Sequence, residues 1–447
     1  MLAILGFATV ILLLAAVMSK KMSPTAALIA VPVVTGVIAS FFIEDGAGTV
    51  NVGANIKALS SYITGSGGIG SVAATGVMFI FSILFFGVLT DAGTFRPIIS
   101  GILNIIGCDP VKITIGTAVL AMIVHLDGSG AVTFLICIPA LLPLYDALQM
   151  KRTTLATVVA MAAGVMNIMP WGGPTIRAAA AMGVDVMVLF GPLIAPVLIG
   201  LAAVLFFAFL LGSSEKKRLG SNSAEISCTE EPLTEETAAL LRPDRFRINI
   251  LLIIAAIAAL LFSGFAPASV FMIAFVLAMI INYPDPAMQT QRVNAHAKEA
   301  LMMASVLFAA GAFTGIMKGT GMISAMAGAL VAVIPQSLGH YFPVITGVVA
   351  MPSSLLFDPD SFYYGVLPVL SATAESFGIS GISIARAAVL GQMTTGFPVS
   401  PLTASTFLLT GLAGVDLGEH QKKTIPLSFA LTLIMLAAAL IFGAVEL

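Results

Sequence analysis

The chain has 447 residues, of which 59% are hydrophobic and only 9% are charged, and its mean hydropathy is +1.07. A water-soluble fold of this length could not cover itself with polar side chains, so the composition indicates a polytopic membrane protein. The net charge of -2 and the lack of a long basic run give no reason to expect nucleic-acid binding. The isolated cysteines Cys108, Cys137 and Cys228 argue against a disulfide framework or a cysteine metal cluster, and we expect them to be packing residues.

The N-terminal part of the chain contains apolar runs that predict membrane spans, which need roughly 20 apolar residues each. The first run, Leu2 to Val17, resembles the apolar core of a signal sequence. It ends in Ser-Lys-Lys-Met without a small-residue cleavage pattern, so we expect it to be retained as a span. The predicted spans of this part cover about residues 2–18, 24–43 and 71–90, followed by an interfacial segment near 96–107.

The next apolar stretch, residues 113–148, is interrupted by the polar sequence His-Leu-Asp-Gly-Ser-Gly. Unpaired backbone groups are costly in a bilayer, so such a break is tolerated only inside protein or beside a water-filled cavity. We therefore predict a re-entrant helical hairpin with arms at 113–126 and 130–148 and with its tip at a binding site. A broken helix at 153–183, interrupted at Pro170-Trp-Gly-Gly-Pro174, and a span at 186–212 follow.

The segment 213–247 is polar, mixes Lys, Arg and Glu, and has the composition of a flexible linker. The part that follows repeats the order of the first part. It has spans at about 248–264, 267–283 and 298–317, an interfacial piece near 322–335, a hairpin at 342–373 interrupted at Phe357–Ser361, a broken helix at 382–412 interrupted at Gly396–Pro401, and a last span at 424–444.

The two halves, residues 1–212 and 248–447, are predicted to be inverted repeats. A hairpin returns to the side from which it entered, so each half crosses the membrane five times, and an odd number of crossings inverts the second half. Short cytoplasmic loops hold an excess of Lys and Arg. If the N-terminus is outside, the inside segments carry Lys20, Lys21, Lys151, Arg152 and the basic residues of the linker. We therefore expect both termini outside and the linker in the cytoplasm.

The first hairpin tip holds Asp127, with His125 before it and Gly128, Ser129 and Gly130 after it. The glycines let the backbone approach a ligand closely, and the carboxylate could coordinate a divalent cation or accept a proton. Asp127 could instead cap the second arm with help from Ser129, but an ionisable residue at membrane depth favours a functional role. His125 could brace Asp127 or carry a coupled proton.

The first broken helix supplies an amide, a hydroxyl, open backbone and a cation. A guanidinium can bind a carboxylate through two hydrogen bonds, so we predict that Arg177 binds substrate, the alternatives being a pair with a structural aspartate or a place at the membrane interface. Trp171, the only tryptophan, is either a wall of the site or an interface anchor. The predicted binding residues of this break are Asn167, Gly172, Gly173, Thr175 and Arg177.

The second hairpin tip contains Asp358, Asp360 and Ser361. Two carboxylates two residues apart could bind a metal, but Asp-Pro-Asp is also a common turn and helix-start pattern. The second broken helix offers neutral donors, although hydroxyls in membrane helices can bond only to their own backbone. Broken helices bring N-termini that favour anions and unwound carbonyls that favour cations to one site. The predicted binding residues here are Ser361, Thr394, Thr395, Ser400 and Thr403.

These motifs resemble one transporter family over nearly the whole chain. The chain is similar to the citrate-metal:proton symporter family, CitMHS, in HLDGSGAVTFLICIPALLPLY, NIMPWGGPTIRAA, DPDSFYYGVLPVL and SPLTASTFLLTGLAGVDLGEHQK, and in MLAILGF and SKKMSPTAALIAVP near the N-terminus. This family belongs to the ion transporter superfamily. Beside the all-α inverted repeat predicted above, the resemblance implies a homodimer with a scaffold domain and an elevator-like transport domain.

The resemblance also implies uptake of citrate complexed with a divalent cation, Mg²⁺ or Ca²⁺, in symport with protons across a bacterial inner membrane. The metal would be co-transported, and no permanently bound cofactor is expected. Citrate is a trianion near neutral pH, whereas its complex with a divalent metal is a monoanion, so less charge has to be desolvated. Asp127, Asp358 and Asp360 are then candidate metal ligands, and His125 and Asp127 are candidate proton carriers.

Other functions fit the sequence less well. The nearest alternative is a proton- or sodium-coupled symporter of another di- or tricarboxylate without metal. Tyr145-Asp146 matches half of an intramembrane aspartyl-protease signature, but the matching Gly-x-Gly-Asp is absent, and no Ser-His arrangement or HExxH motif supports an enzyme. A channel would not need two re-entrant breaks and two broken helices in inverted halves. The sequence therefore predicts a transporter and no enzyme activity.

Overall fold

The computed structural model describes residues 1–19, 21–44, 48–98, 101, 109–219 and 235–446. These residues form helices and loops, with no strand among them. The first half contains α1 (Leu2–Met18), α2 (Pro24–Ala39), α3 (Val52–Thr64), α4 (Ile69–Asp91), α6 (Pro110–Val124), α7 (Gly130–Ala147), α8 (Arg152–Met166), α9 (Gly173–Met182), α10 (Val186–Phe190) and α11 (Ile194–Leu219).

The second half also ends on a long helix. It contains α12 (Glu235–Leu240), α13 (Phe246–Phe262), α14 (Pro267–Asn282), α15 (Pro286–Gly319), α16 (Met322–Val331), α17 (Gln336–Gly339), α18 (Phe342–Ser353), α19 (Leu367–Ser376), α20 (Gly381–Val389), α21 (Ala404–Ala413) and α22 (Leu417–Ile441).

Six helical segments of the described chain are long and apolar enough to cross a membrane. They are Val52–Asp91, Pro110–Asp127, Gly130–Ala147, Val186–Leu219, Ala300–Gly319 and Leu417–Ile441. Several shorter apolar helices, including α14 and α18, accompany them. The predicted all-α polytopic membrane fold is confirmed.

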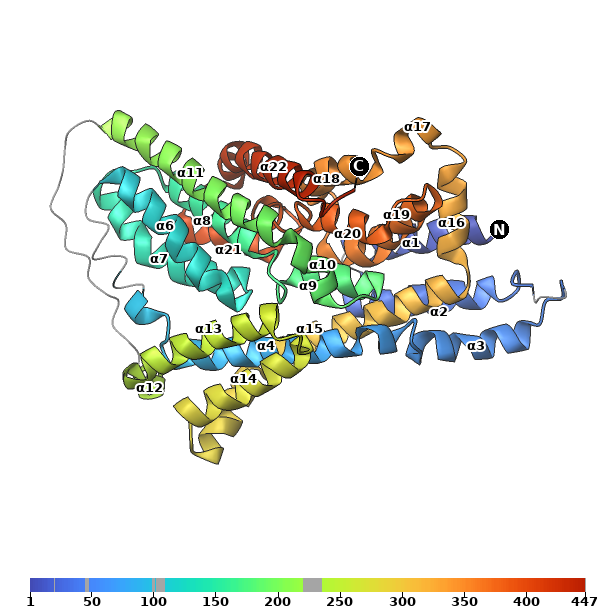
Figure 1. Ribbon diagram of the computed structural model, residues 1–447, viewed down its shortest axis with the longest axis horizontal. Helices are drawn as coiled ribbons and strands as arrows, with labels where there is room; N and C mark the ends of the chain where they lie inside the picture. The colour runs from blue at the N-terminus through green and yellow to red at the C-terminus, as the bar shows by residue number, and fades with distance from the viewer. Residues whose placement is uncertain (20, 45–47, 99–100, 102–108, 220–234, 447) are drawn as a thin grey trace.

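The helices pack as two bodies, which Figure 1 shows above and below one another. The flanking body comprises α2, α3, α4, α13, α14 and α15, with α4 packed against α14 and α15, and α15 against α2 and α3. The hairpin body comprises α6 to α11 and α18 to α22, with α11 packed against α6, α8 and α22. α1 packs on α2 and α16, and α16 packs on α19. α9 joins the two bodies because it contacts α4 and α15.

Glycines let helices of the flanking body cross at short range. A Cβ on Gly76 of α4 would lie 2.7 Å from the Phe308 ring of α15, and one on Gly87 would lie 2.7 Å from the His296 ring. Small residues at such crossings allow the close van der Waals packing on which helix association in membranes depends. At the end of α4, Asp91 Oδ2 accepts hydrogen bonds from His296 Nε2 at 2.9 Å and from an Arg292 Nη1 at 3.2 Å.

The helices of the first hairpin lie close to their predicted ranges. Its arms are α6 and α7, joined by the short helix η1 (His125–Asp127). The second hairpin has α18 and α19 as its arms, with a π-helical turn, η4 (Ser361–Val366), at the start of the second arm. The first broken helix consists of α8 and α9.

The second broken helix differs from its prediction. α20 ends at Val389, well before the predicted break at Gly396, and α21 begins only at Ala404, with the short turn η5 (Phe397–Val399) between them. The unwound part is therefore longer than the Gly-Pro pattern indicated. Its backbone bends at Met393, a residue other than glycine with φ of +50°, which sequence rules assign to glycine or asparagine.

Several other predictions need correction or lie outside the described residues. The irregular stretch after α2 contains an unpredicted helix, α3. The linker begins later than the predicted residue 213, because α11 continues to Leu219. Lys216, Lys217 and Arg218 extend α11 as its last turn, where cations are favourable. Most of the predicted interfacial segment 96–107 and the linker residues 220–234 are outside the described residues, as are Cys108 and Cys228. Cys137 is a buried packing residue, as predicted.

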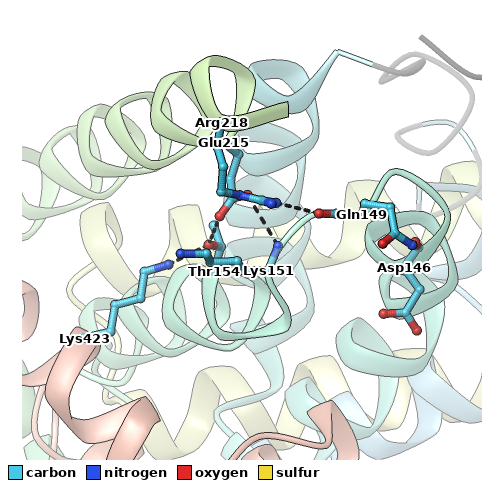
Figure 2. A network of polar contacts seen from close by, with 7 residues as sticks. All are labelled: Asp146, Gln149, Lys151, Thr154, Glu215, Arg218 and Lys423. Atoms are coloured by element: carbon cyan, nitrogen blue, oxygen red, sulfur yellow. Dashed lines mark hydrogen bonds and ion pairs between the residues drawn. The ribbon is translucent and has the colours of Figure 1, made fainter. Parts of the chain in front are cut away.

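A polar network fixes the end of α11 where the linker begins (Figure 2). The Glu215 carboxylate is buried and accepts hydrogen bonds from Thr154 Oγ1 at 2.7 Å and from Arg218 Nη2 at 2.7 Å. It also accepts one from the Lys151 N–H at the start of α8, which has no capping side chain of its own. Lys423 of α22 donates to Thr154 Oγ1. Glu215 thus caps α8 from another helix and ties three helices together.

A second ion pair fixes α11 to the start of the first hairpin. Lys216 Nζ lies 2.7 Å from Asp109 Oδ2, and Asp109 caps α6 through the Val111 N–H. The hydrogen bond from Lys216 lowers the pKa of the Asp109 carboxyl. The base of the hairpin is therefore held to the helix that leads into the linker.

Glu215→Gln is expected to destabilise the folded protein. The neutral amide cannot pair with Arg218, and its NH₂ group would face the Thr154 hydroxyl or the Lys151 N–H, so we expect a loss of about 1–3 kcal/mol. Thermal unfolding of the detergent-solubilised protein measures this loss. Glu419→Gln, on the exposed first turn of α22, is the matched control, and equal unfolding temperatures for the two variants would contradict the capping role.

Candidate functional site

The first hairpin tip is held by side chains from both broken helices. Trp171 Nε1 donates to the Leu126 carbonyl at 2.7 Å. The Phe397 ring stacks on His125 with centroids 6.1 Å apart, and a Cβ on Gly130 would lie 2.7 Å from that ring. Gly128 has φ of +77°, a left-handed conformation that glycine adopts without strain. The tip therefore packs between the unwound segments of the two broken helices.

The two unwound segments contact one another at Met393. The Asn167 amide donates to the Met393 carbonyl at 2.9 Å, while the Met393 N–H donates to Ser354 Oγ at 2.8 Å. Both groups of this strained residue are thus satisfied by side chains from other elements. A Cβ on Gly164 would lie 2.9 Å from the Thr395 Cα, so α8 also crosses the second break at close range.

The second hairpin tip is joined to both broken helices. Ser400 Oγ donates to the Ser354 carbonyl, and Tyr363 Oη donates to the Gln392 carbonyl at 2.7 Å. Asp360 Oδ1 pairs with Arg177 Nε of α9 at 2.7 Å, and each side chain is only 12% exposed. The tips and breaks of two chain segments more than a hundred residues apart therefore form one connected cluster.

The charged side chains and helix N-termini of this cluster favour a ligand that has both positive and negative charge. The two tips bear the carboxylates Asp127, Asp358 and Asp360, and the flanks of the broken helices bear the guanidinium groups of Arg177 and Arg386, of which Arg386 donates to the backbone carbonyls of Val188, Leu189 and Ala444. The N-termini of α9 and α21 begin at the breaks without a capping side chain, so their N–H groups can face an anion. The cluster could accordingly bind an anion whose negative charge is largely neutralised.

A cavity of about 450 Å³ opens at the second tip. Asp358 and Asp360 line it together with Lys21 and Ser23 of the turn between α1 and α2, and with Leu402 of the second break. This size lies within the range of small-molecule sites. The carboxylates of the second tip are thus adjacent to open space.

The comparison with protein families decides the class of the chain. A family model described as CitMHS, citrate transporter, matches residues 1–391. The protein belongs to the CitMHS citrate transporter family. The predicted family resemblance is thereby confirmed.

Relatives of this CitMHS chain match it from end to end. The "Citrate transporter" of Bacillus subtilis (strain 168) is 42% identical over 446 residues, which covers 100% of both chains. The "Mg(2+)/citrate complex secondary transporter" of the same organism is 39% identical and covers 100% of this chain and 99% of the relative. Among solved structures, the Alcanivorax borkumensis YdaH transporter matches 89% of this chain and 90% of its own, with a TM-score of 0.60. At 16% identity, that likeness shows the fold alone.

In this CitMHS protein, the residues predicted at the first tip make local contacts. Asp127 Oδ1 accepts from the Ser129 N–H at 2.8 Å, and Ser129 Oγ accepts from the Val132 N–H at 3.3 Å, so Ser129 caps α7. His125 is buried and its Nδ1 lies 2.8 Å from Thr133 Oγ1. Its Nε2 is without a hydrogen-bond partner in the described chain. The tip therefore combines a capping role with a buried imidazole nitrogen that has no hydrogen-bond partner among the described residues.

Most predicted hydroxyls donate to nearby backbone carbonyls. Thr175 donates to Ile168 at 2.8 Å, Thr394 to Val389 at 2.8 Å, and Thr403 to Phe397 at 2.9 Å. Thr395 Oγ1 instead lies 2.6 Å from Thr432 Oγ1 of α22. These bonds satisfy the unwound backbone, as expected of hydroxyls in membrane helices. Substrate contacts by these residues remain predictions.

The predicted glycines lie at close approaches of the chain, and Asp358 of the second tip accepts hydrogen bonds from groups near it in the sequence. A Cβ on Gly172 would collide with the Asn167 carbonyl, and one on Gly173 would lie 2.7 Å from Arg177 Nη1. Asp358 accepts from the N–H groups of Asp360 and Ser361 at 3.1 Å each, and from Ser361 Oγ. Asp358 thus starts the second arm, which was the alternative interpretation of the Asp-Pro-Asp pattern. No group of three or more His, Cys, Asp or Glu side chains that could hold a metal occurs within the described residues.

Three residues that hold the cluster together, Ser354, Phe397 and Met393, were not predicted as site residues from the sequence. Ser354 precedes the predicted second tip, Phe397 was only part of a Gly-Pro break, and Met393 carries no turn signal. A Ser within an apolar helix next to a tip is the one available indication for Ser354. The strained turn at Met393 depends on partners that are distant in the sequence.

The Arg177–Asp360 pair is expected to behave as a coupled unit. Removal of either partner leaves a buried charge unpaired, so Arg177→Met and Asp360→Asn should each lower stability by about 3–5 kcal/mol, and the double variant should lose much less than the sum. Thermal unfolding in detergent measures the coupling. The exposed Arg152–Asp146 pair, expected to contribute about 0–1 kcal/mol, is the control. Additive losses for Arg177 and Asp360 would contradict the pairing.

Proposed function

We propose that this protein takes up citrate as a complex with a divalent cation, Mg²⁺ or Ca²⁺, in symport with protons. The membership in a citrate transporter family and the end-to-end likeness to a relative named for the Mg²⁺–citrate complex support the proposal. The protein is then a secondary transporter without catalytic activity or a resident cofactor. It would lie in the inner membrane of a bacterium, with both termini outside and residues 213–247 in the cytoplasm.

The charge balance of the four breaks is the main observation in favour of a metal–citrate complex as the substrate. Asp127, Asp358 and Asp360 lie at the two tips, and Arg177 beside the first break already pairs with Asp360. A bare citrate trianion would meet net negative charge in a region where charges are poorly solvated. A metal–citrate monoanion brings its own cation, and citrate oxygens supply most of the ligands that the protein lacks. Asp127, Asp358 or Asp360 could complete the coordination of the ion.

The individual roles follow the same logic. Arg177, the N-termini of α9 and α21, and the polar groups of Asn167, Thr394, Thr395 and Ser400 would face citrate oxygens. His125 and Asp127 would carry the coupled proton, because His125 has an unpartnered nitrogen and lies two residues from the carboxylate. The glycines Gly128, Gly130, Gly172 and Gly173 would let the backbone approach the ligand.

The two bodies suggest how the site could change sides. We propose that residues 1–212 and 248–447 are inverted repeats, that the flanking body is the scaffold, and that the hairpin body moves against it in an elevator-like way within a homodimer. In the described chain, α9, η1, η4 and Trp171 of the hairpin body contact α4, α14 and α15 of the flanking body. The cluster of tips and breaks would then move with the hairpin body.

Removal of free divalent cations is expected to abolish citrate uptake. Proteoliposomes that contain the full chain would be placed in a medium with labelled citrate and Mg²⁺ or Ca²⁺, under an inward proton gradient. The same uptake would be measured with and without EDTA. Uptake should need both the metal and the gradient. Uptake that persists in EDTA would instead favour a metal-free di- or tricarboxylate symporter, and a rate that depends on Na⁺ but not on pH would remove the proton assignment.

Asp127→Asn is expected to remove the stimulation of uptake by external acidification. An amide cannot take up a proton in this pH range or offer a charge to the metal, so proton coupling and metal preference should both change. Initial uptake rates across a pH and Mg²⁺ series measure these changes. Asp146→Asn, in the last turn of α7 at the base of the same hairpin, is the control and should behave as wild type. An unchanged pH profile in Asp127→Asn would assign the coupling to another group.

A further inference from the structure

Trp171 lies at the boundary between the hairpin body and the flanking body. It belongs to the break of the first broken helix and is only 4% exposed. Its ring lies 5.7 Å from the Phe86 ring of α4 and meets the Phe271 ring of α14 edge-on at 5.6 Å. Both phenylalanines belong to the flanking body. Of the ring contacts recorded in the described chain, the two that cross between the bodies both involve Trp171.

The same side chain holds the backbone of the first hairpin tip. Its indole N–H donates to the Leu126 carbonyl at 2.7 Å, next to Asp127. Its Cδ1 lies 3.3 Å from where a Cβ on Gly128 would stand, and Gly128 has the left-handed φ that forms the tip. The polar edge of Trp171 is thus used by the tip, and its apolar face by the flanking body.

We infer that Trp171 is a positioning residue that couples the geometry of the first tip to the contact between the two bodies. While the ring is packed against Phe86 and Phe271, the indole N–H fixes the Leu126 carbonyl and keeps the tip in the conformation described here. When the hairpin body shifts against the flanking body, the ring loses these partners and the tip loses its restraint. The inference rests on the proposed function for the ligand and for the movement of the hairpin body, whereas the contacts of Trp171 do not depend on it.

A spectroscopic test needs no substrate, because Trp171 is the only tryptophan of the chain. Fluorescence of the detergent-solubilised full chain should show a blue-shifted emission with little quenching by acrylamide. Phe86→Leu and Phe271→Leu should shift the emission to longer wavelength and raise the quenching, whereas Phe206→Leu, at an exposed position of α11, should not. Unchanged emission and quenching in both interface variants would overturn the inference.

A kinetic test distinguishes the hydrogen bond of the Trp171 indole N–H from the packing of its ring. Trp171→Phe keeps a ring but removes the N–H donor, so the tip should be less well ordered and KM for Mg²⁺–citrate should rise about fivefold, the factor that the loss of one net hydrogen bond gives. Phe86→Leu keeps the donor and should change mainly the maximal rate. A wild-type KM in Trp171→Phe would overturn the coupling. If wild type itself takes up no Mg²⁺–citrate, the proposed function fails, whereas the fluorescence test still decides whether Trp171 packs at the boundary between the two bodies.

Discussion

Interrupting helices inside an apolar protein leaves backbone N–H and C=O groups that must find partners, and the architecture of the binding cluster follows from this constraint. At the second break, Met393 gives its N–H to Ser354 and its carbonyl accepts from Asn167. At the first tip, the Leu126 carbonyl accepts from Trp171. Some of the partners are thus side chains from another break or its flank, so the interruptions stabilise one another.

This mutual dependence explains why so few polar groups of the cluster are left over for a ligand. Thr175, Thr394 and Thr403 donate their protons to unwound carbonyls. What stays available is the acceptor side of the hydroxyls, the uncapped starts of α9 and α21, and the buried Nε2 of His125. Such a site is better suited to a ligand of low net charge that brings its own coordination than to a bare polyanion.

The sequence predicted helices and tips well where local chemistry sets them. The Asp-Gly-Ser-Gly tip, the arms beside it and the Gly-Gly-Pro start of α9 lie within a few residues of prediction, because glycine, proline and capping residues act locally. The extent of the second break was not predictable in the same way. Its turn at Met393 and the pairing of Arg177 with Asp360 depend on contacts across 183 to 226 residues, which no local pattern encodes. The helix α3 was missed because its polar residues weaken the apolar signal.

The Arg177–Asp360 pair sets a condition on any substrate that uses this arginine. Asp360 Oδ1 engages Nε, and both side chains are nearly buried, so a citrate carboxylate has to share the guanidinium with Asp360 or replace it. Sharing leaves two carboxylates on one cation, which is tolerable only if a metal ion or a proton compensates the second negative charge. Replacement frees Asp360 beside Asp358, at the rim of the cavity that also contains Lys21. In both cases a carboxylate bound at Arg177 would change the charge balance of the second hairpin tip, so the binding of such an anion and of the cation that accompanies it would be thermodynamically coupled.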